Sequence, residues 1–545
     1  MSTTRKPPAG KTPADKTRAR KASAAPARST PAKAASPAPR SSTRASGGSS
    51  GAVALGPIIA AMRKRLPKAH HAEGEAFARA FYQRMGQDEL PQHTAAGWAA
   101  LASDFLDFAR VRKPDTALVR LFTPTAATHG WESPHTVLQI ANDDMPFLVD
   151  SVTMALTEQG IGVHVLGHPV VLFQRDKGGK LRAVGEGTPE SLMHLEIDRQ
   201  PLEAMPKIEQ AVQAVLADVR AIVRDWSQMR GRMREVAEDL GSRKLPVSEA
   251  GREEAQEFLR WAADDHFTLL GYREYEVVKK DGEEVLSAVK GSGLGLLRGQ
   301  DTRKPRPLTS LAAHYMPQSG SVDALILTKT NARATVHRPG YMDYIGVLTF
   351  NADGKPVREE RFLGLYTSSA YNRRPWDIPI VRQRYDYVME KSGLPSNSHS
   401  GKALRHIIES LPRDELFQST GEELLRTSAG ILGLQERVRS RLFLRRDRYG
   451  RFFSGLVYIP RDRFNTDVRL RIEAMLRRVL HGEHVDTTVV LGESPLAQLH
   501  LLVRPKSGEA IQVDNAAIEA ELAEIVRNWQ DDLREQLVAR NGEER

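Results

Sequence analysis

The chain has 545 residues, of which 40% are hydrophobic and 27% are charged, and it contains no cysteine. These values are typical of a globular protein with several domains, and they exclude disulfide bonds, thiolate catalysis and cysteine-ligated metal sites. The formal net charge of +10 belongs to the first 50 residues, which hold eleven of the 78 Lys and Arg residues and one of the 68 acidic residues.

Residues 1–52 form a basic extension of Ala, Pro, Ser, Thr, Lys and Arg, with no large apolar residue between Met1 and Val53. Such a segment cannot bury a core, so we expect it to be disordered. Two interpretations stay open: a loose electrostatic contact with nucleic acid or another anionic surface, or a solvated extension. Because the rest of the chain has no net charge, nucleic acid is an unlikely partner of the folded part. No apolar run approaches the ~18 residues that a membrane helix needs, so no membrane partner is expected.

Residues 53–129 are predicted to be mainly helical, because apolar residues recur at helical spacing in the segments 55–66, 74–85 and 95–111. Leu121–Gly130 is interpreted as a linker. A strand–helix–strand–strand pattern follows: residues 135–141, 162–176 and 191–198 read as strands, and 147–159 as a helix. A long helix is then predicted from Pro206 to Leu240, with apolar residues every three or four positions, Trp226 among them. At 1.5 Å per residue it would be ~50 Å long, so it is either a packing strut to the next domain or a dimer seam. The strut is favoured, because the apolar stripe is not the pure a and d pattern of a coiled-coil heptad.

The stretch NDDMPFLVDS, residues 142–151, places three aspartates close together at Asp143, Asp144 and Asp150. Asp143 or Asp144 is expected to cap the following helix, and Pro146 fits the first helical turn. Asp144 and Asp150 would lie roughly 240° apart around a helix, so they do not converge as a catalytic pair. The stretch is therefore predicted to be a helix start.

The second half of the chain repeats the mixture of strands and helices. Its predicted elements are a helix at 253–265, a hairpin around residues 280–282, strands at 321–330 and 334–367 with a turn at 353–354, helices within 376–433, a hairpin over 449–450, a helix from 466 to Gly482, strands at 485–493 and 497–505, and a charged helix at 515–540.

Two segments have compositions that suggest ligand binding. KGSGLGLLRG, residues 290–299, lacks the glycine spacing of a dinucleotide fingerprint and is followed by prolines, so we do not predict a nucleotide site there. YNRRPWDIPIVRQR, residues 371–384, contains Arg373, Arg374 and Trp376. These side chains would suit a carboxylate or phosphate clamp, and the alternative is a docking surface or interdomain linker.

The sequence Asp144-Met145-Pro146-Phe147-Leu148, within strand–helix–strand–strand, resembles the opening of an ACT-like domain, the small βαββαβ module that senses amino acids. Phe147 stands where ACT domains usually have the Gly that lets a ligand approach the backbone. The resemblance implies an amino-acid effector. Its candidate ligand residues are Asn142, Asp143, Asp144, Phe147, Arg373, Arg374 and Trp376.

After residue 52 the chain resembles the N-terminal segment of the large bacterial NAD-specific glutamate dehydrogenases. The stretches that carry the resemblance occur in family order: NDDMPFLVDSVTMAL, RWAADDHFTLLGYREYEV, GLGLLRG, FLGLYTSSAYNRRPWDIPIVR, FQSTGEELLRTSAGILGLQER and FFSGLVYIPRDRFNTDVR. The resemblance implies an α+β multidomain fold with ACT-like βαββαβ sandwiches and a PAS-like unit joined by long helices. The implied divisions are a disordered tail at 1–52, a helical region at 53–129, ACT-like units at 130–245 and 435–505, a PAS-like unit at 252–370, a helical linker at 371–434, and a C-terminal helix at 506–545 leading to a missing catalytic part.

By this resemblance the complete protein is a cytoplasmic, homo-oligomeric oxidoreductase of glutamate catabolism, which uses NAD to convert L-glutamate to 2-oxoglutarate and ammonium. The chain matches neither the catalytic lysine motif nor the Rossmann half of such an enzyme. We therefore expect a non-catalytic regulatory and assembly segment, a truncation or fragment whose downstream part binds NAD. Two alternatives stay open: a free-standing amino-acid-sensing protein, and a nucleic-acid-associated protein acting through its basic tail.

Overall fold

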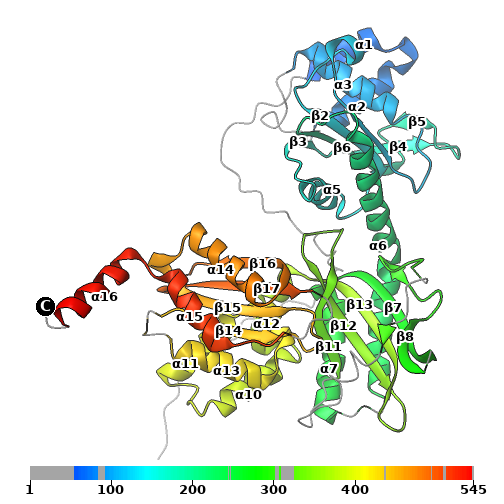
Figure 1. The fold of residues 1–545 in the computed structure, drawn as a ribbon. Coiled ribbons are helices and arrows are strands. Elements are labelled where there is room, and N and C mark those ends of the chain that lie inside the picture. Colours follow the sequence, from blue (N-terminus) through cyan, green and yellow to red (C-terminus); the bar gives the residue numbers. More distant parts are fainter. Residues whose placement is uncertain are drawn as a thin grey trace, which may run out of the picture. The chain divides into compact units, whose positions relative to one another are not determined.

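The fold of the chain is seen in a computed structural model (Figure 1). The structure describes residues 55–83, 93–243, 245, 247–280, 282–300, 306–307, 324–434, 437, 439–492, 494–506 and 511–542. The predicted disorder of the tail at 1–52 concerns residues outside these ranges. Within them the protein is a mixed α+β structure with three antiparallel sheets.

The first helical region is built as predicted, from α1 (Leu55–Arg65), α2 (His71–Tyr82) and α3 (Ala95–Phe108). Fully buried aromatic rings hold these helices together: Phe81 lies 5.2 Å from Phe77 and 5.4 Å from Phe105 between ring centroids. The same core includes Phe173 and Leu192 of the first sheet. The helices therefore cover one face of that sheet.

The first sheet contains six strands, β1 (Leu118–Phe122), β2 (Thr136–Asp143), β3 (Val163–Gly167), β4 (Val170–Arg175), β5 (Leu181–Val184) and β6 (Thr188–Ile197). Their order is β1-β2-β6-β4-β5, and β3 also pairs with β6. The single strand predicted at 162–176 is thus two successive strands along β6, separated at His168-Pro169. The interpretation of Leu121–Gly130 as a linker is wrong, because the segment contains the end of β1 and the short helix α4 (Ala126–His129).

Helix α5 (Leu148–Thr157) and the long helix α6 (Met205–Leu240) cover the other face of the first sheet. The predicted length and stripe of α6 are confirmed, since its inward side chains are buried from Ile208 to Leu240. Its first half packs on α5 and β1, and its second half on the second sheet and α7 (Glu249–Trp261). These contacts are those of a strut. Trp226 departs from the buried stripe, because 37% of its surface is exposed.

The second sheet packs against the second half of α6 (Figure 1). Its strand order is β10-β8-β7-β13-β12-β11, with β9 paired to β7. Its strands are β7 (Phe267–Lys280), β8 (Glu283–Ala288), β9 (Leu294–Gly295), β10 (Arg306–Pro307), β11 (Leu325–Arg333), β12 (Tyr341–Phe350) and β13 (Pro356–Tyr366). The hairpins predicted near Gly282 and Gly354 are confirmed, and both glycines have the positive φ that such turns require. A π-helical turn at Ala262–His266, in which Asp264 and Asp265 have non-helical backbone angles, joins α7 to β7.

Helices follow the second sheet, as predicted: α9 (Ser368–Asn372), a 3-10 turn at Pro375–Asp377, α10 (Val381–Lys391), α11 (His399–Ser410), α12 (Arg413–Gln418) and α13 (Gly421–Leu432). A buried ion cluster joins them to the sheet. Lys329 Nζ of β11 lies 2.7 Å from Asp343 Oδ1 of β12 and 3.2 Å from Asp414 Oδ2 of α12.

The third sheet has the order β14-β15-β17-β16. Its strands and helices are β14 (Arg441–Arg446), β15 (Phe453–Pro460), α14 (Thr466–Val479), β16 (Gly482–Val490), β17 (Leu496–Pro505), α15 (Asn515–Val526) and α16 (Trp529–Asn541). Two predictions are wrong here. The helix predicted to reach Gly482 ends at Val479, and Gly482 begins β16. The single helix expected at 515–540 is two helices, because Asn528 caps α16 by accepting a hydrogen bond from the Asp531 backbone N–H.

The first and third sheets share one topology. In the third sheet, the edge strand β14 is followed by a strand–helix–strand–strand–helix run in the order β14-β15-β17-β16. The first sheet contains the matching order β1-β2-β6-β3, with β4 and β5 inserted between β3 and β6 in the chain. The expected βαββαβ order differs in one respect: the outer strand precedes the run and does not follow its second helix. For the first sheet the reason is visible in α6, which continues to the second sheet and so does not return the chain to the edge beside β2.

Candidate functional site

The predicted ligand residues at the end of β2 are held by side chains from distant parts of the chain. Arg112 donates to Asp143 Oδ1 at 2.7 Å, Arg220 donates to Asn142 Oδ1, and Ser191 Oγ donates to Asp144 at 2.6 Å. The prediction that Asp143 or Asp144 caps the helix is therefore wrong.

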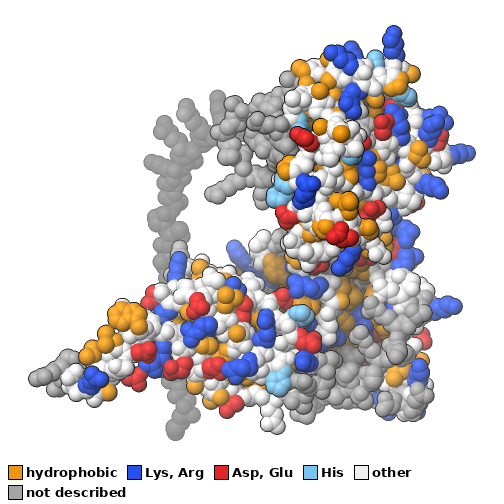
Figure 2. Space-filling model, turned by 45° about the horizontal axis from the view of Figure 1, so that its top comes forward, with side chains coloured by type: hydrophobic (Ala, Val, Ile, Leu, Met, Phe, Trp, Pro, Cys, Tyr) orange, Lys and Arg blue, Asp and Glu red, His pale blue; other side chains and the backbone are white. Residues whose placement is uncertain are grey.

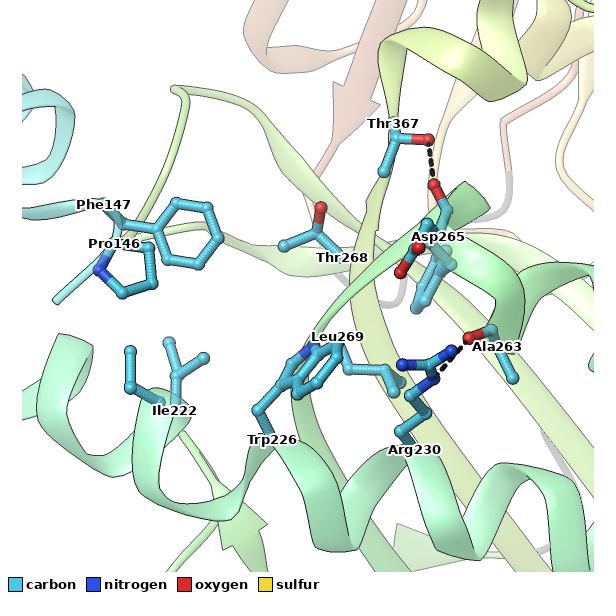
Figure 3. A pocket seen from close by; sticks show the side chains of 12 residues that line it. Pro146, Phe147, Ile222, Trp226, Arg230, Ala263, Asp265, Thr268, Leu269 and Thr367 are labelled. Atoms are coloured by element: carbon cyan, nitrogen blue, oxygen red, sulfur yellow. Dashed lines mark hydrogen bonds between the residues drawn. The ribbon is translucent and has the colours of Figure 1, made fainter. Parts of the chain in front are cut away.

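Helix α5 begins after Phe147, which has a φ of 72° and makes no side-chain capping hydrogen bond. Pro146 lies one residue before this N-cap and not in the first turn. A left-handed conformation is uncommon for a residue with a Cβ. In Figure 3 the Phe147 ring points from its turn toward Thr268.

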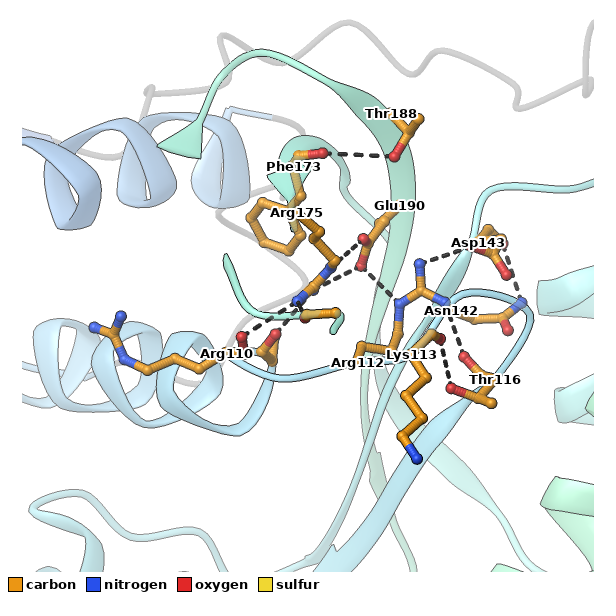
Figure 4. Close-up of polar contacts among 12 residues, drawn as sticks. Arg110, Arg112, Lys113, Thr116, Asn142, Asp143, Phe173, Arg175, Thr188 and Glu190 are labelled. Carbon is orange, nitrogen blue, oxygen red and sulfur yellow. Dashed lines mark hydrogen bonds and ion pairs between the residues drawn. The ribbon is translucent and has the colours of Figure 1, made fainter. Parts of the chain in front are cut away.

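A network of buried ions lies next to Asp143 (Figure 4). Glu190 of β6 is almost fully buried and accepts from Arg112 Nε at 2.9 Å and from Arg175 Nε at 2.5 Å. Arg175 also donates to the carbonyl of Ala109 at 2.8 Å. Burial would lower the pKa of Arg112, but its bonds to Glu190 and Asp143 raise it above the ordinary value. The network fixes the loop after α3 to the sheet, and the carboxylates of Glu190 and Asp143 are both paired with arginines.

A cavity of about 360 Å³ opens on the other side of the β2–α5 turn (Figure 3). Four parts of the chain form it: the turn before α5, the middle of α6, the start of β7 with the turn that precedes it, and Thr367 directly after β13. Its lining residues are Pro146, Phe147, Ile222, Val223, Trp226, Arg230, Ala263, Asp265, Phe267, Thr268, Leu269 and Thr367. The lining is mainly apolar, with polar groups from Arg230, Asp265 and two threonines.

The charged groups of the cavity lie on the side of the Ala262–His266 turn (Figure 3). Arg230 donates its Nε–H to the carbonyl of Ala263 at 2.9 Å, and its guanidinium lies 5.2 Å from the Trp226 ring centroid. One Nη of Arg230 is 3.7 Å from Asp264, whose carboxylate is shared with Arg234. The cation is thus positioned by the backbone and only loosely paired.

Asp265 has a left-handed backbone with a φ of 64°. This conformation is fixed from outside, because Thr367 Oγ1 and Ser369 Oγ both donate to the carbonyl of Asp265, at 3.0 and 3.2 Å. Among the described residues, no side chain or backbone N–H hydrogen-bonds to the Asp265 carboxylate or pairs with it. The cavity therefore offers one anion and one cation beside an apolar wall.

Sequence reasoning found only one wall of this cavity. Phe147 was a predicted ligand residue, and the structure places it there, but Trp226 was counted in the buried stripe of the long helix and Asp265 in a helix end. The one available signal was the sequence Asp264-Asp265-His266 between a helix and a strand, which is a poor continuation for either. Trp226 faces the cavity because α6 leaves the first sheet at this level and has only partly reached the second.

The second group of predicted ligand residues lies elsewhere, in the helical region after β13. The Trp376 ring contacts Tyr385 at 5.2 Å between centroids, and the guanidinium of Arg405 lies over it at 3.9 Å. Arg374 is more distant from the same ring, at 5.9 Å, and Arg373 is exposed. The structure thus does not bring Arg373, Arg374 and Trp376 together with the turn at 142–147.

The glycine-rich loop at 290–299 does not fit a dinucleotide. The backbone N–H of Gly295 donates to Asp225 Oδ2 at 2.9 Å, and the same carboxylate is paired with Arg298. The N–H groups of Leu296, Leu297 and Arg298 donate to backbone carbonyls. An anionic pyrophosphate would meet a carboxylate where it needs free N–H groups.

Two other kinds of feature are absent from the described ranges. They contain no group of three or more His, Asp or Glu side chains arranged to hold a metal ion. No helix of that part of the chain has both the length and the apolarity to cross a membrane.

Comparisons with known protein families give three matches in chain order. Residues 77–212 match the family described as glutamate dehydrogenase, ACT1 domain, residues 378–437 match glutamate dehydrogenase, helical motif 1, and residues 441–530 match glutamate dehydrogenase, ACT2 domain. The ACT1 match contains the first sheet and the start of α6, and the ACT2 match contains the third sheet.

Three curated relatives share most of this chain, and each is named NAD-specific glutamate dehydrogenase. The protein of Halomonas elongata is 36% identical over 496 residues, that of Pseudomonas aeruginosa 35% over 479, and that of Mycobacterium tuberculosis 32% over 426. These alignments cover 89%, 86% and 73% of the chain, but only 31%, 29% and 25% of the relatives. The chain thus spans less than a third of the length of the curated relatives it matches.

Proposed function

Because the chain belongs to the NAD-specific glutamate dehydrogenase family, we propose that it is the regulatory and assembly portion of a larger dehydrogenase. The observation that carries the proposal is the ordered set of family matches, ACT1, helical motif and ACT2. The alignments with the relatives cover most of this chain but under a third of each relative. The dinucleotide-incompatible loop at 290–299 supports a role without hydride transfer.

The proposal includes the division of the chain. Residues 130–245 and 435–505 are ACT-like units, supported by the four-strand order that their sheets share when β1 (Leu118–Phe122) is counted with the first unit. Residues 252–370 are a PAS-like unit, supported by a single antiparallel sheet with α6 and α7 packed against it. Residues 53–129, apart from strand β1 of the first sheet, and residues 371–434 are helical packing regions. In this scheme residues 506–545 lead toward a catalytic part.

In the complete protein, the reaction would be that of L-glutamate, NAD⁺ and water to 2-oxoglutarate, ammonium and NADH, in the cytoplasm and in a homo-oligomer. NAD, L-glutamate and 2-oxoglutarate would bind outside this chain. The test is an absorbance assay for glutamate-dependent NADH formation by the purified chain, with the full-length Halomonas elongata relative as positive control. We expect no activity from the chain alone. NADH formation at a rate comparable to that of the control would overturn the non-catalytic role.

A second candidate function, a free-standing amino-acid-sensing protein, is favoured by one observation: the cavity beside Phe147 has the size of a small-molecule site. An immunoblot of the source cell with an antibody against residues 53–545 separates the two. A band far larger than 60.5 kDa supports the larger dehydrogenase, and a single band at 60.5 kDa supports the free-standing sensor.

A further inference from the structure

We infer that an exposed cationic surface on the helices after the second sheet docks a carboxylate-rich segment of another protein chain. Arg373, Arg374, Trp376 and Arg405 form this surface, which we call the Trp376 surface. The inference goes beyond the proposed function. It concerns a protein partner, and it holds whether or not the chain is part of a dehydrogenase.

The segment that carries the Trp376 surface is more basic than the folded chain as a whole. Residues 371–413 contain eight Lys and Arg residues and four Asp and Glu residues, which gives a formal charge of +4. Residues 51–545 together have no formal net charge. The excess positive charge of this segment is therefore balanced elsewhere in the chain, and the segment itself attracts anionic partners.

The arginines of the surface are not used up by contacts within the chain. Arg382, a few residues further on, is paired with Glu254 at 2.6 Å. Among the described residues, by contrast, no carboxylate lies within salt-bridge distance of Arg373, Arg374 or Arg405. All three are exposed. Their N–H groups can therefore form charge-assisted hydrogen bonds with the carboxylates of a partner.

The Trp376 ring holds two of these cations in place. The guanidinium carbon of Arg405 lies 3.9 Å from the ring centroid, and that of Arg374 lies 5.9 Å from it. The two carbons are thus at most 9.8 Å apart, the sum of these distances. A guanidinium that lies over a ring is ordered while its N–H edge stays available to a carboxylate. At about 3.3 Å per extended residue, carboxylates two or three positions apart in one segment match this separation.

The backbone beneath the Trp376 surface is fixed by Arg413 of α12. Arg413 donates from one Nη to the carbonyl of Arg373 at 3.0 Å, and from the other to the carbonyl of Glu409 at 2.9 Å. Ile378, at the end of the same turn, is fully buried. The surface is therefore preorganised, so docking costs little ordering of its backbone.

The arrangement fits a protein segment better than a nucleic acid or a small molecule. A base needs a free aromatic face, but Arg405 lies over the Trp376 ring and the Tyr385 ring lies 5.2 Å from it between centroids. Small-molecule sites are concave, whereas the arginines here are exposed, and none of these residues lines the cavity beside Phe147. Trp, Tyr and Arg are also the residues that contribute most to binding at protein interfaces.

Fluorescence anisotropy with a labelled octapeptide of glutamate tests the inference, and the octapeptide of glutamine is the negative control. The protein is the full-length chain with its eleven tail Lys and Arg residues changed to Gln, because the unmodified tail would itself attract the anionic peptide. We expect the glutamate peptide to bind at low salt with a dissociation constant below about 100 μM, and more weakly as salt is added. The glutamine peptide should not bind.

Two double variants locate the binding. Arg374→Gln with Arg405→Gln should weaken binding of the glutamate peptide about tenfold or more, because two charge-assisted hydrogen-bonding groups are lost. The matched control is Arg471→Gln with Arg477→Gln. It removes the same charge from two exposed arginines of α14 that also have no salt bridge among the described residues, and it should leave the affinity unchanged.

A charge-conserving variant separates recognition by guanidinium groups from simple attraction. Arg374→Lys with Arg405→Lys keeps both charges but removes the planar fork and its stacking on Trp376. It should weaken the glutamate peptide about threefold or more. All variants should keep the circular dichroism spectrum and the thermal midpoint of the parent, because the changed side chains are exposed.

Several outcomes would overturn the inference. One is no binding of the glutamate peptide at about 0.5 mM protein. Another is equal weakening by the two Gln double variants, or no weakening by the Lys variant, because binding would then follow charge alone. A labelled octamer of thymidylate that binds as tightly, and is lost with Arg374 and Arg405, would assign the surface to nucleic acid. Self-association in sedimentation velocity that disappears in the same variant would assign it to a second copy of the chain. None of these results bears on the size of the native protein or on its dehydrogenase activity.

Discussion

The polar residues at the end of β2 illustrate what sequence reasoning can and cannot predict for single residues. The start of a helix near residue 148 was predictable from the apolar spacing that follows. The partners of Asn142 and Asp143 were not, because Arg112 lies 31 positions before Asp143 and Arg220 lies 78 positions after Asn142. A carboxylate that looks free in a sequence is often paired by a tertiary contact of this kind. Its apparent availability is therefore weak support for a ligand site.

Glu196 of β6 is a buried carboxylate for which the structure predicts a pH dependence. Burial would raise its pKa, but His194, whose Nε2 is 3.7 Å away, and hydrogen bonds from Ser133 and His135 lower the pKa to about 2. A carboxylate whose pKa is lowered by folding stabilises the fold at pH values above its ordinary pKa of 4.5. This stabilisation is lost as the pH falls from about 4.5 to about 2, and its full size is roughly 3 kcal/mol.

Glu196→Gln should therefore lower the urea midpoint of unfolding at pH 7, and the difference from the unmodified chain should shrink between pH 5 and pH 3. The measurement is unfolding followed by circular dichroism at several pH values. Glu203→Gln, at an exposed glutamate shortly after β6, is the matched control and should leave the midpoint unchanged. A difference between Glu196→Gln and the unmodified chain that is the same at pH 7 and pH 3 would contradict the assignment.

At the scale of elements, long periodic segments and turns with glycine were predictable, and short irregular ones were not. The 36-residue helix α6 follows directly from its spacing of apolar residues, and the hairpins at Gly282, Gly354 and Gly450 follow from turn chemistry. Strand β1 was missed because LVRLF is only five residues long and its pairing with β2 is a tertiary fact. The cavity was missed for the same reason: its walls come from segments that are at least 33 positions apart in the chain.

Two helical glycines give opposite predictions for the same substitution. A Cβ at Gly231 of α6 would meet no atom within 4 Å, whereas a Cβ at Gly430 of α13 would lie 2.4 Å from the Phe443 ring. Alanine is favoured over glycine in a helix by about 1 kcal/mol. Gly231→Ala should therefore stabilise the chain by up to that amount. Gly430→Ala should destabilise it, because the ring and the helix must move apart.

Thermal unfolding of the two variants, measured by scanning calorimetry, compares them in one background. An increase in the midpoint for Gly231→Ala and a decrease for Gly430→Ala are expected. Equal shifts of the same sign would mean that helix propensity alone decides the outcome, and that the close contact between α13 and β14 is not present in solution.

At the scale of the whole molecule, the four strands β1-β2-β6-β3 of the first sheet have the same order as the four strands of the third, and each sheet falls within an ACT match. The α+β class, and the order of two ACT domains with a helical region before the second, were predictable from the family resemblance. The position of the edge strand before each unit was not, because a sequence pattern does not say which strand closes a sheet. The long helix α6 then links the first sheet to the second, so the cavity is lined both by the turn after β2 and by the start of β7.

The net charge of the molecule lies in its N-terminal tail, and this location leads to a last prediction. The tail carries +10, and residues 51–545 have no formal net charge. Figure 2 shows acidic and basic side chains interspersed over the described surface in that view. Deleting residues 1–50 should therefore abolish retention on immobilised heparin at low salt, because the polyanion attraction comes from the tail and is screened over about 10 Å at 0.1 M salt. A variant with the eleven tail Lys and Arg residues changed to Gln keeps the length of the chain and should behave as the deletion does. If the deleted chain is retained as strongly as the full chain, the basic surface lies in the folded part, and the nucleic-acid hypothesis must be moved there.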